Sequence, residues 1–244
     1  MLVTLMYHRV TNTPAPSRGL EAFSNHLFSL LQQFPIVVPG DKLIRNRVNI
    51  CLTFDDAYFD FYHCVFPLLK LFNIRVLLAI PAGLIVDDTN FSAVTRLDVP
   101  YAQAMDAYKT QATLCTWKEI REMVASGLVI PACHSLTHQK LTQQNLEQEV
   151  IVAKQLLEQK LQTTIDTFVY PYGRMTRSIN KVVNQHYRYA MRIGSALNLN
   201  WKNLHSVIYR VNGDELWSEE KPILTLTDQL YLWARFLSNT IRFK

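Results

Sequence analysis

Apolar and polar residues follow two different periods along the chain. Seven short apolar runs have the length and composition of buried β-strands, and they cover residues 3–7, 49–54, 74–80, 128–133, 166–170, 187–191 and 206–211. Between them apolar residues recur every three or four positions, which predicts helices over 21–33, 60–72, 116–126, 142–161 and 174–186. Strands that alternate with helices form parallel β/α units, so the pattern favours a barrel, incomplete or distorted, over an open doubly wound sheet.

The 244 residues, of which 49% are hydrophobic, fit one domain of this kind. Residues 87–115 are polar and too long for an ordinary β/α connection, so we expect a lid or a wall of a site there. Residues 225–244 have the spacing of an amphipathic helix. We expect this helix to pack on the core, and the alternative is an interfacial membrane helix, because Arg235, Arg242 and Lys244 lie near its apolar positions.

Composition narrows the class of protein. The formal charge of +5 comes from scattered basic residues, which suits an anionic neighbour but predicts no nucleic-acid partner. The chain has no long apolar run and its start does not resemble a secretory signal, so we expect a cytoplasmic protein. The four cysteines form no C-x-x-C pair, and we interpret them as reduced core thiols: Cys51, Cys64, Cys115 and Cys133.

Chemically active residues gather where the predicted strands end. In a parallel barrel these carboxyl ends meet at one face, where reactive groups lie. The candidates are His8, Asp55, Asp56, His134, His138, Tyr170, Pro171, Tyr172 and Arg210. An Asp-Asp pair alone is more often a turn, and an H-x-x-x-H alone is more often a hydrogen-bonded pair. Their shared location favours one site over independent accidents.

The segment "HSLTH" places two imidazoles close enough to hold one cation, and a carboxylate from another strand end would complete the set. Such a site can activate water, and a second carboxylate beside it can accept the proton. Two histidines and one carboxylate also describe the iron site of an oxygenase, which remains an alternative.

Three motifs carry a family resemblance. In order and approximate spacing, "TFDDAY", "HSLTH" and "YPYG" resemble the polysaccharide deacetylase superfamily, also called carbohydrate esterase family four or the NodB-homology domain. The resemblance covers about residues 1–212. With the N-terminal "LMYHRV" it is most similar to the bacterial poly-N-acetylglucosamine de-N-acetylases. It implies a distorted (β/α)7 barrel and hydrolysis of an N-acetyl or similar N-acyl group on an amino sugar by metal-activated water.

The resemblance also implies roles for individual residues. The metal ligands would be Asp56, His134 and His138. The ion would be zinc, although nickel, cobalt and iron accept the same ligands. Asp55 corresponds to the general base, His8 is our candidate for the general acid, and His205 is the reserve. The chain has Ala57 where the family often has glycine, which should be tolerated unless a positive φ is required there.

The third motif would bind substrate through Tyr170, Pro171 and Tyr172, and the backbone N–H of Tyr172 would stabilise the oxyanion. Many members have an arginine where this chain has Val169. We therefore hypothesise that Asp55 borrows Arg210 from the last predicted strand.

Substrate and partners are less defined by the sequence. We expect an N-acetylated saccharide, in a glycan or linked to lipid. A cytoplasmic enzyme in peripheral contact with the inner, anionic face of a membrane fits a lipid-linked sugar. A catalytically altered carbohydrate-binding protein on the same scaffold is an alternative because Val169 departs from the motif. The sequence does not indicate the oligomeric state.

Overall fold

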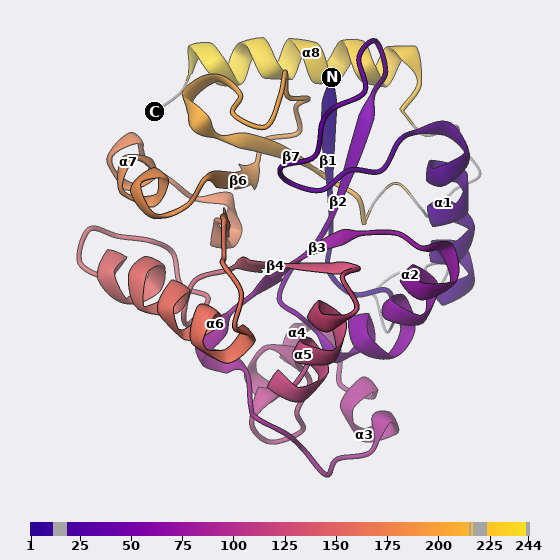
Figure 1. Cartoon of the computed structure of the whole chain (residues 1–244), viewed down its shortest axis with the longest axis vertical. Helices are drawn as coiled ribbons and strands as arrows, with labels where there is room; N and C mark the ends of the chain where they lie inside the picture. The colour runs from indigo at the N-terminus through magenta and orange to yellow at the C-terminus, as the bar shows by residue number, and fades with distance from the viewer. Residues whose placement is uncertain (12–18, 215, 217–223, 243–244) are drawn as a thin grey trace.

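Seven parallel strands form a closed barrel in the computed structural model, which describes residues 1–11, 19–214, 216 and 224–242 (Figure 1). Neighbouring strands pair in chain order, and the last strand pairs with the first. The strands are β1 (Leu2–Tyr7), β2 (Asn49–Phe54), β3 (Val76–Ile80), β4 (Val129–Cys133), β5 (Thr167–Val169), β6 (Tyr189–Ile193) and β7 (Ile208–Asn212). The predicted (β/α)7 barrel is therefore confirmed.

Helices lie around the barrel and cover its outer face (Figure 1). They are α1 (Leu20–Gln33), α2 (Phe66–Phe72), α3 (Ala93–Leu97), α4 (Tyr101–Ala104), α5 (Trp117–Ala125), α6 (Ala153–Leu161), α7 (Arg177–His186) and α8 (Leu226–Ile241). Short 3₁₀ turns occupy Ala82–Leu84, Asp106–Tyr108, Pro171–Gly173 and Leu204–Ser206. The π-helical segments Phe61–Val65 and Glu147–Val152 lead directly into α2 and α6. Apolar periodicity predicted ordinary helices over 60–72 and 142–161, and it did not identify these π-helical turns.

Alternation along the strands separates two cores. Side chains of one parity lie under the helices in the main cluster, as Leu52, Phe54 and Leu78 do. Those of the other parity fill the barrel interior. A second buried cluster consists of Leu77, Ala79, Ala132, Val169, Tyr189, Met191 and Ile208. Because every strand is buried on both faces, the strands read in sequence as continuous apolar runs.

Residues 87–115 contain no strand and contribute Tyr101, Ala102 and Met105 to the wall of a cavity at the strand ends. Arg96 in α3 is buried and makes a two-pronged ion pair with Glu119 of α5, at 2.6 and 2.9 Å. It also donates to the carbonyls of Ala112 and Leu114. These contacts anchor the segment beside the strand ends, and a lid movement remains a prediction.

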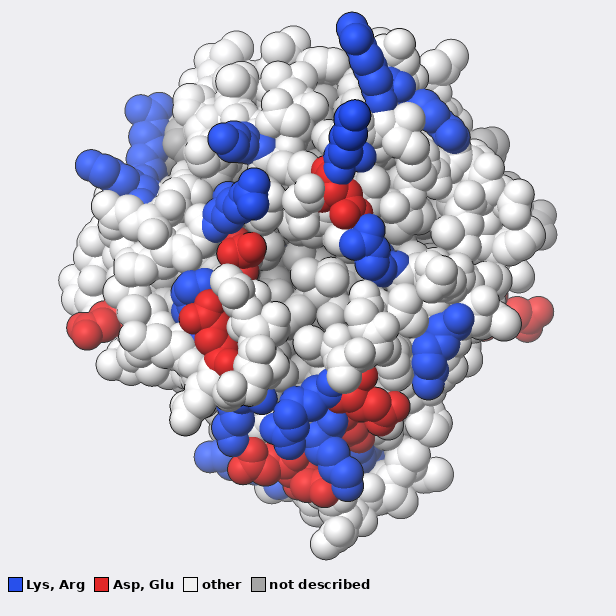
Figure 2. All heavy atoms as spheres, in the orientation of Figure 1, with Lys and Arg blue, Asp and Glu red and all other residues white. Residues whose placement is uncertain are grey.

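The distribution of charged side chains on the surface and the free thiols of the cysteines agree with what the composition indicated. Figure 2 shows Lys and Arg side chains scattered over one face and interspersed with Asp and Glu. Within the described part of the chain, no helix is long and apolar enough to span a bilayer. All four cysteines are free thiols, and Cys64 alone among them is not fully buried. Of the predicted C-terminal segment, residues 243–244 lie outside the described residues.

Candidate metal centre

The two adjacent aspartates both face the end of the barrel because the backbone turns between them. Asp55 has the same parity as Thr53 and so points to the interior. Asp56 and Ala57 then adopt left-handed φ angles of 71° and 53°, which brings the second carboxylate to the same side. The expectation that alanine is harmless at position 57 rested on an ordinary φ. The structure requires a positive one, so Ala57 carries local backbone strain.

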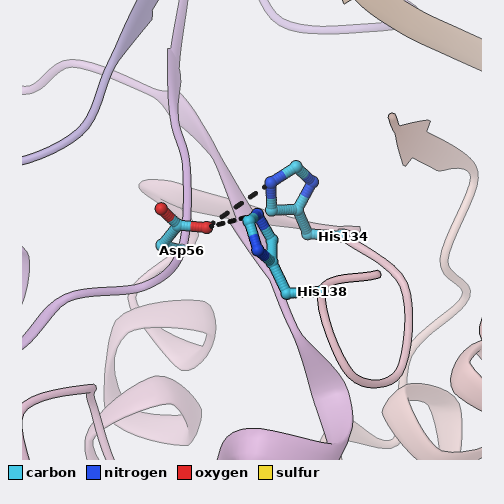
Figure 3. A group of neighbouring side chains, drawn as sticks. All are labelled: Asp56, His134 and His138. Carbon is cyan, nitrogen blue, oxygen red and sulfur yellow. Dashed lines mark ion pairs between the residues drawn. The ribbon is translucent and has the colours of Figure 1, made fainter. Parts of the chain in front are cut away.

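Asp56, His134 and His138 meet at one point (Figure 3). Asp56 Oδ1 lies 3.2 Å from His138 Nε2 and 3.5 Å from His134 Nε2. One potential ligand atom from each residue falls within 4.8 Å of the others. The three side chains come from the turn after β2 and from the loop after β4, two segments far apart in sequence. The predicted convergence is confirmed as geometry.

The chemistry of this group fits a cation. His134 Nδ1 lies 2.8 Å from the carbonyl oxygen of Val169, which can only accept, so Nδ1 carries the proton and Nε2 keeps its lone pair. Burial lowers the pKa of His134, which favours the neutral imidazole that metals bind. Among the described residues, Asp56 Oδ1 is buried without a hydrogen-bond donor. A divalent ion would satisfy that oxygen.

A buried carboxylate shapes the loop that carries His138. Glu149 accepts hydrogen bonds from the N–H groups of Leu136 and Thr137, each at 2.9 Å, and from the Thr137 hydroxyl at 2.6 Å. His138 itself has a left-handed φ of 57°, and its N–H donates to Ser135 Oγ. Glu149 lies in the π-helical segment before α6, a local irregularity that often marks functional sites.

Asp55 forms a buried ion pair with Arg210. The guanidinium donates to both carboxylate oxygens, at 2.6 and 2.8 Å, and it also donates to Thr53 Oγ1 at 3.2 Å. Burial opposes ionisation of Asp55, but Arg210, together with the charges of His134 and His8, holds the pKa of that carboxyl well below its usual range. The hypothesised substitute for the missing motif arginine is present, since Val169 fills the barrel interior and Arg210 reaches Asp55 from β7.

His8 is held by a residue that the sequence analysis did not identify. Asp214 Oδ2 lies 2.7 Å from His8 Nδ1, and Asp214 Oδ1 accepts the backbone N–H of His8. Burial would lower the pKa of His8, but the hydrogen bond to Asp214 and the charges of Asp55, Asp214 and Asp56 raise it to about 9. Asp214 is 206 residues away and follows β7, so only strand pairing reveals the contact.

These groups share a cavity of about 350 Å³ at the strand ends. Its lining consists of Met6, His8, Asp55, Asp56, Tyr58, Tyr101, Ala102, Met105, His134, His138, Tyr170, Tyr172, Ile193 and Arg210. His205 is not in this lining and lies beside α7 instead, so the geometry favours His8 as the acid.

The three residues of the third motif differ in their exposure and in their contact with the cavity. The Tyr172 side chain is 55% exposed, and its ring packs beside His138 with centroids 4.8 Å apart. Tyr170 is buried and donates its hydroxyl to Asn180 of α7, so it offers the cavity no free hydroxyl proton. Pro171 is buried and does not line the cavity. The oxyanion role of the Tyr172 backbone remains a prediction.

Comparisons with known proteins agree with this geometry. The family model described as polysaccharide deacetylase matches residues 44–190, more than half of the chain. No curated protein matches the sequence significantly. Among solved structures, IcaB from Ammonifex degensii is 21% identical, with a TM-score of 0.66 over 96% of this chain and 97% of its own.

Two further structures have the same fold. The deacetylase PplD from Streptococcus pyogenes, in complex with acetate, is 17% identical, with a TM-score of 0.67 over 95% of this chain and 97% of its own. A de-N-acetylase from Aggregatibacter actinomycetemcomitans is 16% identical, with a TM-score of 0.66 over 86% of this chain and 94% of its own. At such identities the likeness establishes the shared fold.

Proposed function

Because the chain belongs to the polysaccharide deacetylase family, we propose that it is a metal-dependent carbohydrate de-N-acetylase. Its substrate would be an amino sugar with an N-acetyl or similar N-acyl group, in a glycan or a lipid-linked saccharide. The observation that carries the proposal is the meeting of Asp56, His134 and His138 beside a separately held Asp55. The Streptococcus and Aggregatibacter proteins, described as deacetylases, support the same reaction class by analogy of fold.

Asp56, His134 and His138 would hold the ion, which when bound lowers the pKa of water and polarises the acyl oxygen. Zinc is our first choice because it readily takes nitrogen and carboxylate ligands, and nickel, cobalt and iron are compatible.

Asp55 accepts the proton of the attacking water in this proposal. Arg210 keeps Asp55 ionised and fixes both carboxylate oxygens, so the base is ready before substrate arrives. Strong pairing with a guanidinium also makes Asp55 a weak base. Asp55 can therefore act as a base only toward an attacking water whose pKa has already been lowered.

His8 donates a proton to the departing amine. With a pKa of about 9 it is protonated at neutral pH, and Asp214 orients the ring by accepting at Nδ1, so Nε2 carries the proton to be donated. The backbone N–H of Tyr172 would stabilise the negative charge that develops on the acyl oxygen.

The cavity suits one sugar residue at a time. Its volume of about 350 Å³ lies near the lower end for small-molecule sites, so the rest of a longer saccharide would lie outside. Tyr58 and Tyr101 contribute rings to its wall, and the exposed ring of Tyr172 lies at its edge. Flat apolar faces of this kind can pack against a sugar ring.

The alternatives fit the site less well. Family membership favours hydrolysis over oxygenase chemistry, and an oxygenase has no evident use for Asp55 fixed beside the ligands. A binding protein on an altered scaffold would not need the pairs Asp55–Arg210 and His8–Asp214, yet both are present.

The test is release of free amine from a panel of N-acetylated saccharides, soluble and lipid-linked, before and after chelation and metal replacement. Asp55→Asn should keep the bound metal and lose roughly 10²–10⁴ in turnover. Asp106→Asn, at an exposed position, is the matched control and should behave as wild type. No amine release from any member of the panel by metal-loaded protein would overturn the proposal.

A further inference from the structure

Helix α8 exposes an apolar face that no described residue covers. Leu226, Leu230, Leu237 and Ile241 are between 56% and 83% exposed. Their spacing of four, seven and four residues places them along one stripe of the helix. Leu232 and Phe236, on another side, are buried and attach α8 to the main core. Figure 1 shows α8 lying across the edge of the molecule.

Two arginines lie on a different side of α8 from this stripe. Arg235 and Arg242 are seven residues apart, so they share one side of the helix. Among the described residues neither forms an ion pair. Asp228 is the only acidic residue of α8, and its carboxylate accepts from the N–H and hydroxyl of Thr225 at the helix start. Arg242 is exposed, whereas Arg235 is partly buried and its Nε has no hydrogen-bond partner among the described residues. The surface of α8 therefore combines an apolar stripe with a separate basic side.

Two aromatic residues complete this surface. Tyr231 is 57% exposed and Trp233 is half-buried beside Phe236. Rings with one polar end are typical of segments that lie at the boundary between headgroups and acyl chains. A second protein chain would have to offer an apolar groove to the stripe and acidic residues to the arginines, whereas an anionic bilayer offers acyl chains to the stripe and phosphates to the basic side.

One residue of α8 contacts the chain next to the cavity. Asn239 of α8 donates a hydrogen bond to the carbonyl of Gly194 at 2.8 Å. Gly194 directly follows Ile193, which ends β6 and lines the cavity.

We propose that the exposed face of α8 docks the protein on an anionic lipid bilayer, with the stripe of Leu226, Leu230, Leu237 and Ile241 among the acyl chains and Arg235 and Arg242 among the headgroups. The protein rests on the membrane without crossing it, consistent with the length of the described helices. This inference does not depend on the chemistry of the cavity.

The test is co-sedimentation of the full-length protein with vesicles of phosphatidylcholine alone or mixed equally with phosphatidylglycerol, at low and high salt. Wild type should bind the mixed vesicles and lose much of that binding at high salt. Replacing Leu230, Leu237 and Ile241 together by serine should weaken binding about a hundredfold or more. Arg235→Gln and Arg242→Gln should each weaken binding to mixed vesicles roughly fivefold.

Leu71→Ser is the matched control, because Leu71 is 74% exposed on α2, away from α8 in the sequence and in the fold. It should bind as wild type does, and circular dichroism should show all variants folded. Absence of binding to either vesicle, or equal loss in the Leu71 variant, would overturn the proposal. So would a stable dimer in sedimentation analysis that the triple serine variant dissociates, since a second copy would then cover the face. Amine release from a soluble saccharide, measured in parallel, keeps failure of membrane docking separate from failure of the proposed reaction.

Discussion

Replacing Glu149 by glutamine should weaken metal binding although residue 149 contacts no ligand atom. Glu149 is buried, and its carboxylate accepts three hydrogen bonds from Leu136 and Thr137, which lie between the two candidate histidine ligands. A hydrogen bond to a charged group contributes about 1.5–3 kcal/mol. The amide of glutamine keeps an acceptor oxygen but loses the charge, and its NH₂ group faces donors.

The expected cost follows from these bonds. If the substitution removes roughly half of the interaction energy of these three hydrogen bonds, about 2–4 kcal/mol is lost. Part of this loss lowers folding stability, and part releases His138 from its fixed position. A share of about 1.4–2.7 kcal/mol in the loop position corresponds to a 10- to 100-fold weaker metal complex. The measurement is competition between the apo-protein and a chromophoric zinc chelator, with thermal unfolding recorded with and without zinc.

A matched control lies in the same helical segment. Glu147 is exposed, so Glu147→Gln changes the same chemical group two residues away and should alter zinc affinity less than twofold. If folded Glu149→Gln bound zinc as tightly as wild type, the loop would be held by other contacts and Glu149 would have no positioning role.

Three other predictions concern charge. Arg210→Met should destabilise the protein by about 3–5 kcal/mol at pH 7, because it leaves Asp55 buried and unpaired. The folded pKa of Asp55 is depressed, so the stability advantage of the wild type over this variant is present above about pH 4. That advantage should shrink in acid denaturation curves as Asp55 becomes protonated. Asp214→Asn should lower the pKa of His8 from about 9, so the alkaline limb of the kcat/KM profile should move to lower pH; an unchanged limb would mean that His8 is not the acid. Adding zinc to chelated protein at a hundred times its Kd should raise stability by about 2.7 kcal/mol, and Asp56→Asn should abolish most of that gain in calorimetry.

The sequence predicted the barrel and the grouping of the three candidate metal ligands well because both depend on local signals. Continuous apolar runs identify strands that are buried on both faces, and reactive residues directly after them must meet at one end of a parallel barrel. Asp56, His134 and His138 could therefore be grouped without coordinates. The predicted strand 166–170 is shorter in the structure, because the backbone already turns into the Pro171–Gly173 segment after Val169.

Residues that support the site were harder to recognise. Glu149 occupies a polar position in an amphipathic pattern, where an exposed side chain is the default interpretation. Asp214 follows the last strand and meets His8 only because β7 pairs with β1. The alanine at position 57 does not itself indicate a positive φ, since alanine rarely adopts one, and only the glycine that is frequent there in the family hinted at it. Such features depend on closure of the barrel and on loop conformation, which no nearby sequence pattern encodes.

The alternation of inward and outward side chains in β2 constrains how this protein can change during evolution. Asp55 reaches Arg210 because its position has the parity of Thr53 and Cys51. Substitutions leave that parity intact, whereas insertion or deletion of a single residue within the strand would send Asp55 outward beneath the helices. Lineages of this chain should therefore accumulate point changes in β2 and confine length variation to the connections.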